Sequence, residues 1–310
     1  MERDVMKKYS LLICFLITFT ASVTFPSSPD VNSPPISFSQ GSRVGTLEAE
    51  NITEVSGIAA SRKNPGILWV HNDSDNSPAI YAITAEGKLV ATCRIKEAIC
   101  RDWEDIAIAS DPQKEKSYIY IGDIGDNFAR RSSIFIYRVE EPKLDPNSPV
   151  KNIEIGPADS IELVYPDSNP MDAETLMVDS LTGDIYIVTK RELLSKVYVV
   201  KYPQSLDEKN TMSLVSAIPW GFATGGDISP DSKLIIIRGM YNASLWIRPE
   251  AGELSDAFSR QHYRIELIQE RQGEAICFDS EGLGYYTTSE GFNPPIHYFP
   301  GKEVKNPTSD

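Results

Sequence analysis

The chain has 310 residues and a formal net charge of −14, from 30 Lys and Arg against 44 Asp and Glu. Hydrophobic residues make up 41% and charged residues 24%, a globular mixture that excludes an intrinsically disordered chain. A strongly acidic surface repels phosphate backbones, so we expect no nucleic-acid partner.

The first 24 residues have the pattern of a secretory signal peptide. A pair of lysines precedes a short apolar run at 11–17, and the small residues Ala21 and Ser22 follow it. These are the three parts of such a signal. We therefore expect a secreted or periplasmic protein, with an uncleaved, membrane-tethering N-terminal segment as the alternative. No later segment is long and apolar enough to span a bilayer.

One short pattern recurs five times along the chain: an acidic or small residue, one further residue, a branched apolar residue, and then alternation. The apolar positions follow one another at steps of 48, 70, 52 and 48, and they are Ile58, Ile106, Leu176, Ile228 and Ile276. Each is followed by a turn and by further segments rich in β-branched and aromatic residues. Four-stranded units at this spacing predict an all-β protein, a β-propeller.

The repeats predict five four-stranded blades, with six blades as the alternative. The step of 70 exceeds its neighbours by roughly 20 residues, too few for another blade of about 45, so we interpret the excess around Glu141 and Pro157 as an insertion. The last repeat ends after Phe299 without a fourth strand, and the N-terminal segment 43–47 is available to supply it and close the ring. The predicted layout is a signal peptide at 1–24, a Pro/Ser-rich tether at 25–42, the propeller at 43–302 and a polar tail at 303–310.

Three cysteines follow the predicted signal: Cys93, Cys100 and Cys277. An odd number argues against a disulfide scaffold. Cys93 and Cys100 are close enough in sequence to pair in an oxidising compartment, and two free thiols are the alternative. Cys277 lies in a predicted innermost strand, where we expect an inert core residue.

Propeller topology brings the candidate functional residues to one axial face, because the loops into each first strand and out of each second strand open on the same side. The candidate catalytic residues are Glu104, Glu174, Glu274 and His71, and the same three glutamates are the candidate metal ligands. The candidate ligand-binding residues are Asp73, Asp123, Asn127, Lys190, Arg238 and Glu290.

The three glutamates stand two residues before the indexed apolar residue of their repeats, so we expect them to converge on one axial mouth. At about 6 Å and an effective dielectric of about 20, each pair repels by about 3 kcal/mol. A counter-charge is therefore required. Lys190, Arg238 and a divalent cation are the candidates, and hard oxygen ligands suit Ca²⁺ or Mg²⁺.

Several short strings resemble a group of uncharacterised secreted bacterial propeller proteins over roughly residues 45–300. They are Asp102-Trp103-Glu104-Asp105-Ile106-Ala107, Gly122-Asp123-Ile124-Gly125-Asp126-Asn127, Asp172-Ala173-Glu174, Asp227-Ile228-Ser229-Pro230-Asp231 and Gln272-Gly273-Glu274-Ala275. The chain is also distantly similar to the phytase-like esterase propeller domain, which has glutamates before its inner strands. That second resemblance implies a propeller with a polar axial site, where hydrolysis is one function to test.

Two functional hypotheses follow. The first is a ligand- or partner-binding protein with an acidic axial pocket, whose partner is a small molecule or an extracellular molecule. The alternative is a divalent-metal-dependent hydrolase of an ester, lactone or phosphoester, in which the metal activates water. The fold hosts both kinds of function. No complete catalytic set is visible in the sequence, which favours binding, and we expect a monomer.

Overall fold

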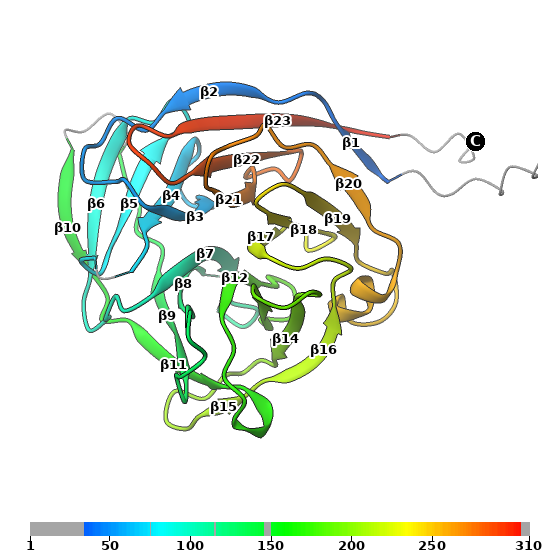
Figure 1. The fold of residues 1–310 in the computed structure, drawn as a ribbon. Helices are drawn as coiled ribbons and strands as arrows, with labels where there is room; N and C mark the ends of the chain where they lie inside the picture. Colours follow the sequence, from blue (N-terminus) through cyan, green and yellow to red (C-terminus); the bar gives the residue numbers. More distant parts are fainter. Residues whose placement is uncertain (1–33, 75, 115, 146–149, 305–310) are drawn as a thin grey trace, which may run out of the picture. The chain divides into compact units, whose positions relative to one another are not determined.

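The computed structural model describes residues 34–74, 76–114, 116–145 and 150–304. The predicted signal peptide, half of the predicted tether and most of the predicted polar tail lie outside these residues. Five small sheets stand around a central axis, so the protein is a five-bladed β-propeller (Figure 1). The prediction of five blades is confirmed, and the six-bladed alternative is wrong. Within the described ranges, no helix is both long and apolar enough to cross a membrane.

Each blade has four strands, counted outward from the axis. The inner strands are β3 (Val55–Ala60), β7 (Trp103–Ser110), β12 (Ala173–Val178), β17 (Ala223–Ile228) and β21 (Gly273–Phe278). The second strands are β4 (Ile67–Asn72), β8 (Ser117–Asp123), β13 (Ile185–Thr189), β18 (Leu234–Gly239) and β22 (Gly284–Ser289). The third strands are β5 (Ala79–Thr84), β9 (Ile134–Glu140), β14 (Lys196–Val200), β19 (Ala243–Ile247) and β23 (Pro295–Glu303). The fourth strands are β6 (Leu89–Ile95), β11 (Asp159–Val164), β16 (Ser213–Ala217), β20 (Tyr263–Ile265) and, for blade five, β2 (Ser42–Thr46).

The hydrophobic core lies between the blades. It consists of five clusters, and each is filled from two adjacent blades. Trp69 and Trp103, for example, are both fully buried between blades one and two. Cys277 is fully buried between blades five and one, as predicted. Because each blade supplies one side of two clusters, no blade can bury its apolar faces alone.

The N-terminal strand closes the ring as predicted. β2 pairs antiparallel with β23, with Ser42 opposite Tyr298 and Thr46 opposite Pro295. A further strand, β1 (Ile36–Phe38), pairs with the far end of β23, so the final blade begins inside the range predicted as a tether. β2 also lies against blade one, since a side chain on Gly45 would overlap the Ala85 carbonyl oxygen.

Deleting residues 34–46 is therefore expected to lower the melting temperature by at least about 5 °C, because it removes two strands and opens the ring. Differential scanning calorimetry measures the effect by comparing two chains, one that begins at Pro34 and one that also lacks residues 34–46. Equal melting temperatures for the two chains would contradict ring closure by β2.

Outer blade edges are covered by segments of the following blade. β10 (Lys151–Ile155) comes from the long third-to-fourth connection of blade two and pairs parallel with β6 of blade one. β15 (Asn210–Thr211) comes from blade three and pairs parallel with β11 of blade two. The step of 70 residues is thus an insertion, as predicted, and it protects an edge strand that would otherwise expose unpaired backbone groups. The two short 3₁₀ helices are η1 (Pro166–Ser168) and η2 (Leu254–Ser259).

Glu141, at the start of this insertion, joins blades one and two. Its carboxylate is fully buried and accepts hydrogen bonds from Trp69 Nε1 at 3.0 Å, Ser117 Oγ at 2.6 Å and the Lys63 amide at 3.1 Å. The Ser61 hydroxyl donates to it as well. One carboxylate thus satisfies donors from two strands, β4 and β8, and from the first turn of blade one.

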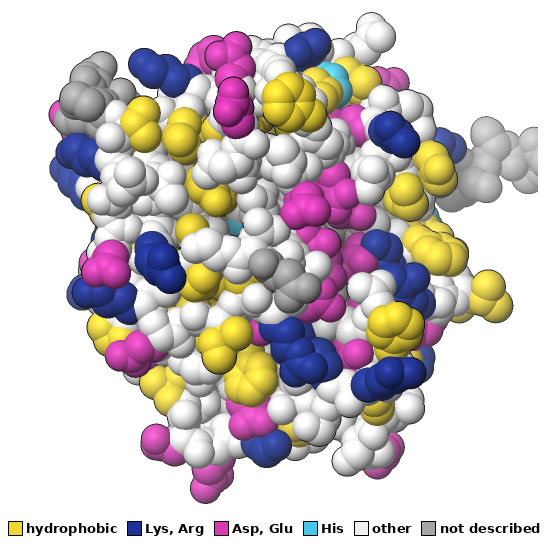
Figure 2. All heavy atoms as spheres, turned by 60° about the vertical axis from the view of Figure 1, so that its left-hand side comes forward, with side chains coloured by type: hydrophobic (Ala, Val, Ile, Leu, Met, Phe, Trp, Pro, Cys, Tyr) yellow, Lys and Arg dark blue, Asp and Glu magenta, His cyan; other side chains and the backbone are white. Residues whose placement is uncertain are grey.

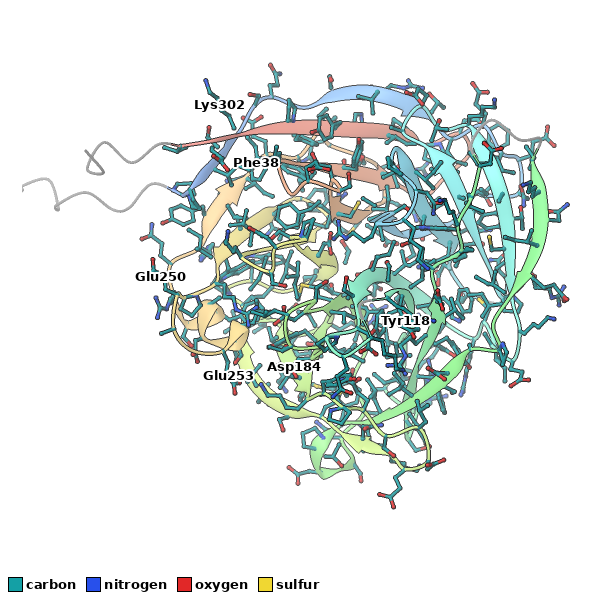
Figure 3. All side chains as sticks on the ribbon, turned by 180° about the vertical axis from the view of Figure 1, so that it is seen from behind. Phe38, Tyr118, Asp184, Glu250, Glu253 and Lys302 are labelled. Carbon is teal, nitrogen blue, oxygen red and sulfur yellow. The ribbon has the colours of Figure 1, made fainter. Side chains whose placement is uncertain are left out.

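Blades three and four share an ion pair at the end of the propeller where the first strand of each blade turns into the second. Lys201 Nζ lies 3.1 Å from Asp184 Oδ2 and 2.6 Å from Glu253 Oε2. Both carboxylates are seen from behind in Figure 3. Cys93 and Cys100 are free thiols, and both belong to the cluster between blades one and two.

Candidate functional site

Every inner strand begins with a β-bulge at the same height of the ring, and the bulges align the repeats. The bulged residues are Ser56, Glu104, Glu174, Thr224 and Glu274. This confirms that the three glutamates are equivalent. The sequence alignment of the fourth repeat on Ile228 is wrong, because the bulge at Thr224 makes Gly226 the residue equivalent to Ile58. A bulge re-aims the side chain that it carries, here at the end of the axis where the inner strands begin. We call this end the axial mouth.

Two of the three glutamates, Glu174 and Glu274, converge at the axial mouth on Lys190. Lys190 Nζ contacts Glu174 Oε1 and lies 3.7 Å from Glu274 Oε1. Burial opposes protonation of Lys190, but the charges of Glu174 and Glu274 outweigh it and raise the pKa of the lysine. The counter-charge that the sequence required is therefore present for two of the three glutamates, and it is Lys190.

The remaining glutamate, Glu104, is in a different environment. Its side chain is buried, and burial together with the charge of Glu174 raises its pKa well above the ordinary value. Burial also raises the pKa of Glu174 to about 8 in spite of Lys190. Glu174 Oε2 is buried and has no hydrogen-bond partner among the described residues. The mouth thus holds more carboxyl groups than its own lysine can pair with.

Glu104 forms a close group with Asp73 and Asp102. One carboxylate oxygen from each of the three residues lies within 4.8 Å of the others. Asp73 follows β4 of blade one, and Asp102 precedes β7 of blade two, so the two blades share the group. Burial raises the pKa of Asp73 to about 6 and also raises the pKa of Asp102. Asp102 was not among the predicted site residues, although its place two residues before Glu104 was a signal.

Three other predicted residues lie on loops of the mouth. Asp123 Oδ1 is 2.8 Å from Arg131 NH1, which orders the loop after β8. The Asn127 side chain accepts a hydrogen bond from Arg191, which ties the loops of blades two and three. Glu290 accepts a hydrogen bond from the Gln272 side chain, and burial followed by the charge of Glu274 raises its pKa to about 8.

Arg238 and His71 are not exposed at the mouth. Arg238 is fully buried and its NH1 donates to Glu270 Oε2 at 2.9 Å and to the Ala275 carbonyl at 3.1 Å. This is a structural ion pair below the surface. His71 is also fully buried, with Nδ1 donating to the Asn72 carbonyl at 2.8 Å, and burial lowers its pKa to about 4. The imidazole is therefore neutral at pH 7 and packed inside the fold.

Two aspartates of the inner strands have a structural role. Asp105 accepts hydrogen bonds from the Ile106 amide of its own blade at 2.8 Å and from the Leu176 amide of blade three at 2.9 Å. In the same manner, Asp227 accepts a hydrogen bond from the Phe278 amide of blade five at 2.9 Å. These carboxylates hold neighbouring inner strands together.

The loops around the mouth carry the most exposed large apolar side chains of the described residues. The exposed fractions of the five most exposed side chains range from 91% for Leu193 to 68% for Tyr241. The five most exposed are Ile99, Phe128, Leu193, Tyr241 and Phe292, and each comes from a loop into a first strand or out of a second strand. Figure 2 shows carboxylate side chains gathered on this face, with hydrophobic and basic side chains around them.

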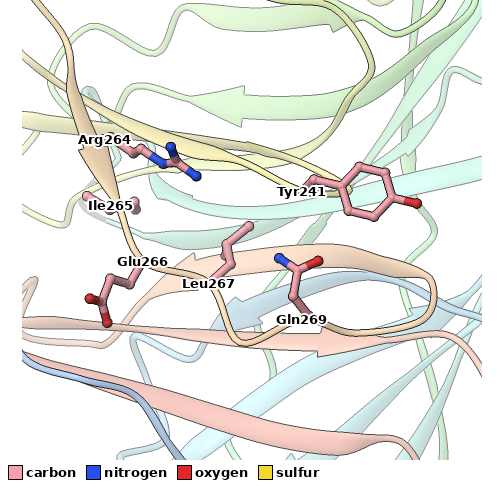
Figure 4. Close-up of a pocket in the computed structure, with 6 residues that line it drawn as sticks. All are labelled: Tyr241, Arg264, Ile265, Glu266, Leu267 and Gln269. Atoms are coloured by element: carbon pink, nitrogen blue, oxygen red, sulfur yellow. The ribbon is translucent and has the colours of Figure 1, made fainter.

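A hollow of about 570 Å³ opens beside Tyr241 between blades four and five (Figure 4). Its other lining residues belong to β20 and the segment that leads from it toward β21, and they are Arg264, Ile265, Glu266, Leu267 and Gln269. Another hollow, of about 740 Å³, lies on the opposite side and includes Leu181 and Leu283. None of the predicted site residues lines either hollow.

No family model and no curated protein sequence matches the chain. Solved structures that resemble it include hydrazine synthase of Kuenenia stuttgartiensis, at 13% identity and a TM-score of 0.41 over 77% of this chain and 56% of that one. The chain thus spans little more than half of that protein. Others are a chain of a nidogen/laminin complex, at 14% identity and a TM-score of 0.42 over 77% of this chain and 73% of that one, and the Pan2 WD40 domain of Neurospora crassa, at 10% identity and a TM-score of 0.41 over 86% and 97%.

Proposed function

We propose that this propeller is a binding protein whose mouth face recognises a basic, amphipathic polypeptide segment. The observation that carries the proposal is the coincidence of two features on one face. The five most exposed large apolar side chains of the described residues surround a group of carboxylates that lacks sufficient counter-charge. Exposed apolar side chains around a charged centre are typical of a protein-binding surface.

The charge of the mouth favours a basic partner. Asp73 and Glu290 are half-buried, and their pKa values are raised to about 6 and about 8 by burial and by neighbouring carboxylates. Two arginines of the mouth already have carboxylate partners: Arg131 pairs with Asp123, and Arg191 pairs with Asp172 at 2.6 Å. A lysine or arginine of the partner would lower the pKa values of these carboxyl groups and pair with their charged forms, which favours association.

The apolar ring favours an amphipathic partner. Phe128, Tyr241 and Phe292 project from three different blades, so a segment lying across the mouth would contact several of them at once. The hollow beside Tyr241 is large enough to receive an apolar side chain. Aromatic residues of this kind supply much of the binding energy of protein interfaces.

The same charge argues for a monomer. Two copies that met through their mouth faces would place acidic groups against acidic groups, which is unfavourable. We also propose, from the N-terminal signal pattern alone, that the protein acts outside the cytoplasm. His71, one of the candidate catalytic residues of the hydrolase alternative, is enclosed and neutral, so it does not face a substrate at the mouth.

The proposal is tested with a short fluorescent peptide of alternating lysine and leucine, titrated with the whole protein in the presence of EDTA. We expect saturable binding that weakens as salt is added. Leu193→Ser and Phe292→Ser should each weaken it about fivefold or more, since each removes an exposed apolar contact.

Two controls make this measurement specific. Leu181→Ser changes an exposed leucine on the opposite face and should leave the affinity unchanged. A peptide with glutamate in place of lysine should not bind. If the acidic peptide binds as tightly, or if Leu181→Ser has the same effect as Leu193→Ser, the mouth face does not recognise a basic segment.

A further inference from the structure

We propose that the axial mouth contains a calcium site formed by Asp73, Asp102 and Glu104. The site differs from the set of three glutamates expected from the sequence, because Lys190 pairs with Glu174 and Glu274. It requires no polypeptide partner, so it stands independently of the function proposed above.

The chemistry of the three carboxylates suits calcium. One oxygen from each residue lies within 4.8 Å of the other two. Three carboxylate oxygens this close together can share one cation, because calcium binds its oxygen ligands at about 2.3–2.6 Å. Three anionic oxygens, two on loops and one on the bulge of β7, also provide the oxygen-only coordination that calcium accepts.

A second observation points to a missing cation at the same place. The Glu104 side chain is 4% exposed, and its carboxylate forms no ion pair with a lysine or arginine among the described residues, since Lys190 pairs with Glu174 and Glu274. Beside it, Glu174 Oε2 is buried and has no partner in the described part of the chain. Buried carboxylates are normally paired with a donor, a cation or a metal ion, because burial without compensation is costly.

The cations nearby are committed elsewhere. Lys190 contacts Glu174 and lies within 3.7 Å of Glu274. Arg131 NH1 donates to Asp123 at 2.8 Å and to the Gly125 carbonyl at 2.8 Å. Among the residues that the structure places, none of Asp73, Asp102 and Glu104 forms a direct ion pair with a lysine or arginine, although the charge of Arg131 acts on Asp102.

The backbone at Gly125 packs directly against two of the proposed ligands, Glu104 and Asp102. A Cβ atom at this position would overlap Glu104 Oε1 and would lie 2.5 Å from Asp102 Oδ2. Glycine thus allows these two carboxylates to come together against the backbone. An alanine at this position would separate them without changing any charge.

The test is isothermal titration calorimetry of the whole, EDTA-treated protein with CaCl₂ and, separately, MgCl₂. We expect calcium to saturate one site and to bind more tightly than magnesium. Glu104→Gln and Asp102→Asn should each weaken calcium binding at least about tenfold, since each removes an anionic ligand.

Gly125→Ala and Asp231→Asn distinguish a built site from diffuse attraction. Gly125→Ala keeps every carboxylate and should also weaken calcium binding at least about tenfold, whereas Asp231→Asn removes a charge on the opposite face and should have no effect. Circular dichroism verifies that each variant is folded. Absence of calcium binding, or an affinity unchanged in both Gly125→Ala and Glu104→Gln, would overturn the proposal. Because the peptide assay contains EDTA, failure of the calcium site leaves its outcome unaffected.

Discussion

Replacing Glu141 with glutamine is expected to lower the free energy of unfolding by about 3 kcal/mol, and the melting temperature with it by roughly 5–10 °C. The carboxylate is fully buried and only accepts hydrogen bonds, from Trp69, Ser117 and the first turn of blade one among others. Glutamine would place an NH₂ group against donors, so at least one buried donor would lose its partner.

Urea denaturation of the wild type and the variant measures this change. The adjacent Glu140→Gln is the matched control, because Glu140 forms half-exposed ion pairs with Lys63 and Lys116. Exposed pairs of this kind contribute less than about 1 kcal/mol. If the two variants lost equal stability, Glu141 would not be the connection between blades one and two.

The metal-free protein is expected to lose about 1–2 kcal/mol of stability between pH 6.5 and 8. Burial raises the pKa of Glu174 to about 8 in the folded state, whereas an unfolded glutamate has a pKa of 4.5. The folded protein therefore binds more protons than the unfolded chain in this window, and stability falls as the pH rises. Glu290 acts in the same direction, but solvent screens it. His71 has the opposite effect only below pH 6.5, because its pKa is lowered.

Thermal unfolding in EDTA across this pH window tests the prediction. Glu174→Gln should flatten the dependence, because it removes the group that titrates. Glu140→Gln should leave the dependence unchanged, since two lysines lower the Glu140 pKa to about 2 and the group stays charged throughout. A melting temperature that rises from pH 6.5 to 8 would contradict the raised pKa of the buried glutamates.

The fold was largely predictable because it depends on features that repeat. Five apolar segments at similar steps and the missing last strand predicted five blades and closure by β2. The fourth repeat was misaligned by two residues, because Gly226-Asp227-Ile228 resembles the other repeats more closely than the true bulge at Thr224 does. A bulge is a property of strand pairing, and one sequence does not reveal the pairing.

The site was predictable in its location but not in its pairings. Repeat position alone brought Glu104, Glu174 and Glu274 to one mouth. Which cation reaches them depends on side-chain direction, and Lys190 and Arg238 looked equivalent in the sequence. Arg238 turned inward because Glu270 and the Ala275 carbonyl are available below the surface.

Hydrogen–deuterium exchange with and without the lysine–leucine peptide, in EDTA, tests most directly whether the mouth face is a binding surface. We expect slower exchange in the loops at 97–102, 124–131, 190–194 and 289–293, and no change in the turns at 180–183 and 280–283 on the opposite face. Protection confined to the opposite face, or spread evenly over both faces, would contradict the proposed function.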